Sequence, residues 1–134
     1  MDFWVGEWDV FKTGGGKVGT NRIEKVLGGA ALQENWRDAG GGEGKSWFYW
    51  MPDRKAWKQV WVTPDSAYKE KVAEPIEGGL LFSGEAVTAD GKRYPDRTRL
   101  TRQGESEVRQ VIEYSADGGK TWTKTFDAVY RRPK

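Results

Sequence analysis

Hydrophobic and polar residues alternate with a period of two along most of the chain, and clusters of Gly or a Pro-Asp pair interrupt the alternation. Such alternation is typical of strands with one buried face, and the interruptions are typical of hairpin turns. Little room is left for helices. The pattern predicts about ten strands, near residues 7–13, 17–26, 31–39, 45–51, 57–63, 67–74, 80–88, 93–102, 107–115 and 121–131.

The connections between the predicted strands are short, so consecutive strands are expected to pair as antiparallel hairpins. A sheet of about ten strands needs its edges closed or covered, and no helix is expected that could cover one. We therefore expect a single all-β domain over residues 1–134, an antiparallel up-and-down barrel. A sandwich of two sheets is the alternative.

The segment Gly6-Glu7-Trp8 opens the first predicted strand and resembles the G-x-W motif of lipocalins and their relatives. In that fold the Trp closes one end of the barrel, and an Arg from the last strand lies over its ring. Here Arg131 and Arg132 stand at the end of the last predicted strand. We expect one of them to contact Trp8.

The resemblance continues along nearly the whole chain, through residues 2–10, 19–25, 33–36, 59–62, 117–122, 126–127 and 130–131. Together these segments resemble a family of small bacterial lipocalin-like proteins that has no assigned biochemical role. The chain is also similar, more distantly, to ten-stranded haem barrels of the nitrobindin type, which hold iron through a His that is missing here. The resemblance implies a cavity and leaves its contents open.

A second motif, residues 115–122, matches the Asp-box pattern S-x-D-x-G-x-T-W of sialidases and other propellers. In propellers the motif recurs once per blade, whereas here it occurs once. We interpret it as a hairpin turn whose amides are capped by Asp117, with Trp122 packed beneath, and not as a sialidase-like site.

Composition excludes several reaction classes, because the chain has neither Cys nor His. Disulfides, thiolate or His-based metal sites and a Ser-His-Asp triad are therefore impossible. The 22 basic and 20 acidic residues are interspersed, which does not favour a nucleic-acid partner. No apolar run predicts a membrane span or a signal segment. We expect a cytoplasmic monomer or homodimer that needs no cofactor or metal.

The eight Trp residues are expected either to fill the barrel or to line a ligand chamber. Where Leu32 and Trp36 point inward, the alternation also brings Glu34 inward. Glu34 is the candidate catalytic acid or base. The candidate ligand-binding residues chosen in this way are Asn21, Trp36, Trp47, Tyr49, Trp57, Gln59, Trp61, Asp96, Gln110, Tyr114, Phe126 and Tyr130, with Lys124 as a further interior candidate. Segments 69–71 and 96–99 are otherwise interpreted as solvated, cross-strand-paired surface.

Three functions are compatible with this pattern. The first is a carrier or sensor that binds a small hydrophobic or aromatic molecule inside the barrel. The second is a cofactor-free isomerase, cyclase or hydro-lyase that uses Glu34, with Gln59, Gln110 or a Tyr stabilising developing charge. The third is a filled barrel that acts as an oligomeric module.

Overall fold

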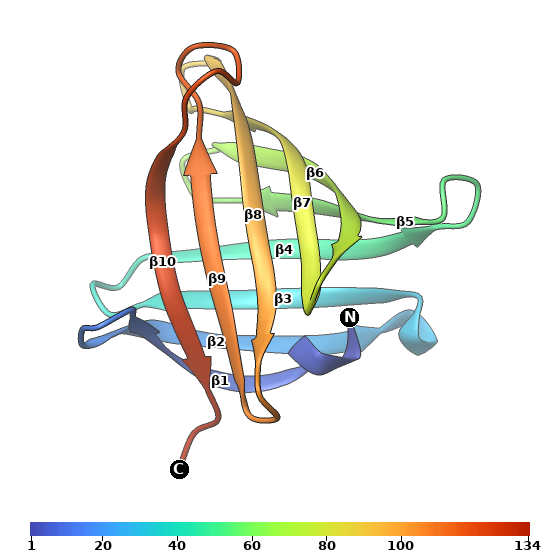
Figure 1. Ribbon diagram of the computed structural model, residues 1–134, viewed down its shortest axis with the longest axis vertical. Coiled ribbons are helices and arrows are strands. Elements are labelled where there is room, and N and C mark those ends of the chain that lie inside the picture. Colours follow the sequence, from blue (N-terminus) through green and yellow to red (C-terminus); the bar gives the residue numbers. More distant parts are fainter.

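Ten antiparallel strands follow one another around a closed barrel in the computed structural model, which describes residues 1–134 (Figure 1). Each strand pairs with its neighbours in sequence, and the last strand returns to pair with the first. The strands are β1 (Gly6–Lys12), β2 (Lys17–Val26), β3 (Ala31–Asp38), β4 (Glu43–Met51), β5 (Ala56–Val62), β6 (Tyr68–Ile76), β7 (Gly79–Val87), β8 (Arg93–Gln103), β9 (Glu107–Tyr114) and β10 (Thr123–Arg131).

This architecture confirms the predicted up-and-down barrel. An open sandwich would leave β1 and β10 as edges, but these strands pair in register from Asp9 with Arg131 to Lys12 with Ala128. Every strand boundary lies within two residues of its predicted position. In Figure 1 the strands β2 to β4 run horizontally, whereas β8 to β10 run vertically, so these two walls of the barrel cross at a steep angle.

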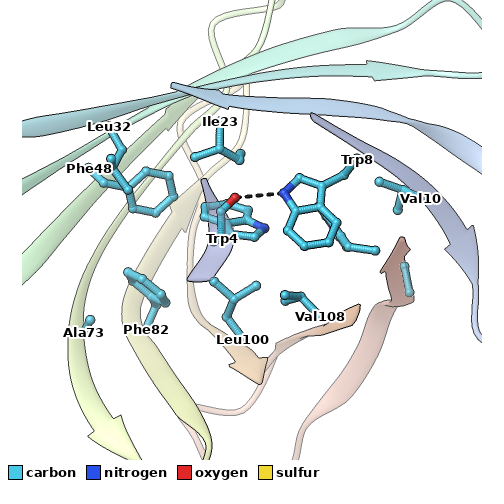
Figure 2. Close-up of a cluster of buried hydrophobic side chains, with 12 residues drawn as sticks. Trp4, Trp8, Val10, Ile23, Leu32, Phe48, Ala73, Phe82, Leu100 and Val108 are labelled. Carbon is cyan, nitrogen blue, oxygen red and sulfur yellow. Dashed lines mark hydrogen bonds between the residues drawn. The ribbon is translucent and has the colours of Figure 1, made fainter. Parts of the chain in front are cut away.

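A hydrophobic core fills one end of the barrel, where a single 3-10 turn, η1 (Asp2–Trp4), leads the chain into β1. Trp4 is only 1% exposed, and its ring meets Phe48 edge-on at a centroid distance of 5.2 Å. The indole N–H of Trp8 donates to the carbonyl oxygen of Trp4 at 2.8 Å (Figure 2). The cluster comprises Trp4, Trp8, Val10, Ile23, Leu32, Phe48, Ala73, Phe82, Leu100, Val108, Ala128 and Tyr130.

The predicted contact between Trp8 and a terminal Arg is confirmed for Arg132. Its guanidinium lies 3.7 Å from the centroid of the Trp8 ring and donates to the carbonyl oxygen of Val5 at 3.1 Å. Gly6 has a φ of +124°, and a Cβ at this position would overlap the guanidinium, so the G-x-W glycine is needed for both reasons. Arg131 instead lies over Phe11 at 5.2 Å.

The Asp-box forms the predicted capped turn between β9 and β10. One carboxylate oxygen of Asp117 accepts the backbone N–H groups of Lys120 and Thr121 at 3.0 and 2.8 Å. Hydrogen bonds from the Thr121 hydroxyl and backbone, and from the Ser115 hydroxyl, lower the pKa of Asp117 to about 2. Trp122 packs beneath the guanidinium of Arg97 at 3.8 Å.

The only other helical element is η2 (Leu27–Gly29), a single turn between β2 and β3. Neither 3-10 turn approaches the length that a membrane-spanning helix requires.

Candidate functional site

Interior side chains change character in the same order along three strands of the barrel. Each strand carries an apolar residue in or against the hydrophobic core, then a buried polar residue, then a second apolar residue. Buried polar residues therefore lie between the core and an apolar chamber, although Trp36 and Phe126 of the chamber also pack against the core. The three series are Leu32, Glu34 and Trp36 on β3, Trp57, Gln59 and Trp61 on β5, and Val108, Gln110 and Ile112 on β9.

The chamber contains a partly open cavity of about 230 Å³. Cavities for drug-sized molecules usually exceed about 300 Å³, whereas an engineered cavity of about 150 Å³ binds benzene. The volume therefore suits one aromatic ring with substituents. The lining residues are Glu34, Trp36, Gln59, Trp61, Lys69, Lys71, Thr98, Gln110, Ile112, Thr125, Phe126 and Tyr130.

Trp36, Trp61, Ile112 and Phe126 form the apolar wall of the cavity. The rings of Trp36 and Phe126 meet edge-on at a centroid distance of 6.0 Å. Gly44 occupies an inward position of β4, and a Cβ there would overlap the indole of Trp61. The missing side chain at Gly44 is thus what allows Trp61 to lie across β4.

Hydrogen bonds connect the polar residues at the base of the cavity. The side-chain amide of Asn21 donates to a carboxyl oxygen of Glu34 at 2.6 Å and to the hydroxyl of Tyr130 at 3.1 Å. That hydroxyl donates to the amide oxygen of Gln110 at 2.9 Å. Burial raises the pKa of Tyr130 well above its usual value, so its hydroxyl remains a donor. The ring of Tyr130 belongs to the core and thereby fixes the network to it.

Glu34 is the buried carboxyl group of this network. Burial raises its pKa, an effect that the hydrogen bond from Asn21 only partly opposes. Gln59 lies on the neighbouring wall and donates its amide N–H to the hydroxyl of Ser46 at 3.0 Å. The amide oxygen of Gln59 is buried and accepts no hydrogen bond from the protein. The base of the cavity therefore contains a buried carboxyl group with a raised pKa and a buried amide oxygen without a hydrogen-bond partner.

A cluster of charged groups forms the wall at β6. The ammonium of Lys71, which is 2% exposed, lies 2.5 Å from a carboxylate oxygen of Asp96 and donates to the hydroxyl of Thr98 at 2.7 Å. Lys69 lies 3.1 Å from the same oxygen of Asp96. Gly84 stands between Lys71 and Asp96 in the sheet register and has no side chain to separate them. Burial, together with the charge of Lys69, lowers the pKa of Lys71 to about 8.

Most of the predicted site residues lie inside the barrel, and seven of them line the cavity: Glu34, Trp36, Gln59, Trp61, Gln110, Phe126 and Tyr130. Asn21 and Asp96 are buried and do not line the cavity themselves. Asn21 is hydrogen-bonded to the lining residue Glu34, and Asp96 is paired with the lining residues Lys69 and Lys71. Trp57 and Tyr114 do not line it, because Trp57 packs edge-on against Trp50 at 5.8 Å and Tyr114 against Tyr94 at 6.0 Å.

The predicted inward orientation of Trp47 and Tyr49 is wrong. Their side chains are 43% and 41% exposed, whereas Ser46 and Phe48 are buried. The outer face of β4 is as aromatic as its inner face, so residue type did not distinguish the two. Lys124 is also outside, where it pairs with Asp127 at 3.1 Å, because the register of β10 shifts between Lys124 and Phe126. A bulge of this kind reverses the side-chain alternation.

The interpretation of segments 69–71 and 96–99 as solvated surface is correct for Arg97 and Arg99, which pair with Glu113 at 3.1 and 3.0 Å. It is wrong for Lys71 and Thr98, which are buried. The alternation on these strands did indicate burial of both residues. Lys71 shares its parity with the buried Ala73, and Thr98 shares its parity with the buried Leu100.

Sequence reasoning also missed Lys69, Ile112 and Thr125 as lining residues. No group of three or more Asp or Glu side chains in the structure could hold a metal ion. Neither a family model nor a curated protein matches the chain. The closed barrel of ten antiparallel strands is consistent with a calycin-like fold.

Proposed function

We propose that this protein binds a small, predominantly aromatic molecule inside its barrel and serves as its carrier or sensor. The observation that carries the proposal is the cavity of about 230 Å³ between the apolar wall and the buried polar residues. The alternative of a filled barrel that acts only as a structural module does not account for this cavity.

The chemistry of the lining supports an aromatic occupant with a polar substituent. Edge and face contacts with Trp36, Trp61 and Phe126 favour a flat ring. The amide oxygen of Gln59, a lining residue, has no hydrogen-bond partner within the protein, and buried acceptors are rarely left without one.

A neutral, light-absorbing probe of the right size tests the proposal. We expect 4-nitrobenzyl alcohol to quench tryptophan fluorescence saturably, and Trp61→Ala to weaken its binding about tenfold, because a large ring contact is lost. Trp47→Ala removes an exposed Trp from the adjacent strand and should leave the affinity unchanged. Linear quenching with the same slope in all three proteins would contradict binding in the cavity.

Acid–base chemistry on the bound molecule is a second candidate function, favoured by the raised pKa of Glu34 at the cavity base. Enzymes commonly tune a catalytic carboxyl upward by burial. Glu34 would move a proton to or from the occupant, while the hydroxyl of Tyr130 and the amide of Gln59 stand within the same lining.

Exchange of the methyl protons of acetophenone into D₂O, followed by NMR, separates this second function from simple binding. If Glu34 acts as a base, the wild-type protein should accelerate exchange and Glu34→Gln should reduce the acceleration about 100-fold. Binding of acetophenone should be largely retained, because the amide has nearly the same shape as the carboxyl group. Equal exchange rates in the two proteins would leave binding as the function.

A further inference from the structure

We propose that the natural occupant carries a negative charge, and that it is a single-ring aromatic carboxylate whose anionic group lies against Lys69 and Lys71. The inference rests on the proposed binding function and specifies the chemical class of its ligand.

The first argument is a count of charges on the cavity wall. Lys69 and Lys71 both approach the same oxygen of one carboxylate, Asp96, at 3.1 and 2.5 Å. Glu34 is the one carboxyl group that lines the cavity; it forms no ion pair, accepts a hydrogen bond from the neutral amide of Asn21, and has a pKa that burial raises although both lysines act against the rise. Two ammonium groups thus share a single ion-paired carboxylate, and the carboxyl group that lines the cavity beside them is held toward its neutral form by burial. A desolvated cation without a full counter-charge is costly, so the arrangement favours an anion.

The second argument is the asymmetry of the cavity. The cations belong to β6, and β7 places Gly84 beside them without a side chain. The apolar wall includes Ile112 on β9 and Phe126 on β10. Trp61 is the register partner of Lys69, so a ring packed on Trp61 brings its substituent close to the ammonium group. A molecule that packs on the apolar wall and also pairs with the lysines has an aromatic ring at one end and an anionic group at the other.

Lys69 is the lysine available to a ligand. Lys71 already contacts Asp96 and Thr98 and is buried, whereas the side chain of Lys69 is 26% exposed and contacts only Asp96. A carboxylate in the cavity could accept a hydrogen bond from Lys69 without displacing the buried pair. Charge-assisted hydrogen bonds of this kind are stronger than neutral ones.

Calorimetric titration with benzoate, benzamide and benzylamine tests the inference, because the three probes share one ring and differ in charge. In low-salt buffer, where screening is weak, we expect benzoate to bind at least about tenfold more tightly than the other two. Lys69→Gln should reduce benzoate affinity about tenfold and leave benzamide affinity unchanged. Lys58→Gln is the matched control. The Lys58 side chain is similarly exposed (22%) and lies near the carboxylate of Glu70, but it points outward from β5 and away from the cavity.

The outcomes separate this inference from the function on which it rests. Benzamide or benzylamine binding as tightly as benzoate would overturn the anionic ligand and leave aromatic binding intact. Equal loss of benzoate affinity in Lys69→Gln and Lys58→Gln would show a general surface charge effect and would also overturn it. Failure of all three probes and of 4-nitrobenzyl alcohol to bind would overturn both proposals.

Discussion

Replacement of Trp8 by Ala is expected to lower the free energy of unfolding by about 3 to 5 kcal/mol, as other large aromatic truncations in protein cores do. Trp8 is 2% exposed and packs edge-on against Tyr130 at a centroid distance of 6.0 Å. Its loss would also leave the carbonyl oxygen of Trp4 without its donor and the guanidinium of Arg132 without its stacking partner. Equilibrium unfolding in urea measures the change.

Trp47→Ala provides the control for this measurement, because Trp47 is 43% exposed. We expect its effect to stay within about 0.5 kcal/mol, the usual range for surface substitutions. A loss of less than about 1 kcal/mol for Trp8→Ala would be too small for a residue in the core and would contradict the closure of the barrel end by Trp8 and Arg132.

The strands and their order could be predicted because each depends on local pattern. Alternation identified ten segments, and the short Gly-rich turns allowed only hairpin connections between them. The contact between Trp8 and a terminal Arg was expected for a different reason, the resemblance of Gly6-Glu7-Trp8 to the G-x-W motif, which left open whether Arg131 or Arg132 makes it. The 3-10 turn that buries Trp4 has no alternation, so the pattern gave no sign that this residue belongs to the core.

The site was harder to predict because composition and alternation disagreed on two strands. On β4, aromatic residues occur on both faces, and the choice of Trp47 and Tyr49 favoured residue type over the buried parity of Ser46 and Phe48. On β6, Lys69 and Lys71 were assigned to solvent because of their charge, although they share parity with Ala73. A buried Lys is rare unless it is paired, and its partner Asp96 lies two strands away, at a distance that sequence spacing does not reveal.

The buried ion pair also gives the second large effect on stability. Lys71→Met should cost about 3 to 5 kcal/mol, because removing one partner of a buried pair leaves the other charge without full compensation. Asp96 is 2% exposed, and only the ion pair with the partly exposed Lys69 would remain to it. Met has a similar length and no charge, so little of the loss would come from an empty space. Chemical denaturation of the two proteins at pH 7 gives the difference.

The double variant Lys71→Met, Asp96→Leu shows whether that cost arises from the broken pair or from the lost packing of Lys71. Replacing both partners of a buried ion pair by apolar residues is often close to neutral, and Lys69 can turn toward solvent once Asp96 is gone. We therefore expect the double variant to lose at least about 2 kcal/mol less free energy of unfolding than the two single variants lose together. A coupling of this size lies within the range found for contacting residues. Additive losses would show that Lys71 and Asp96 act independently, and that the shared oxygen at 2.5 and 3.1 Å is not what stabilises this wall of the barrel.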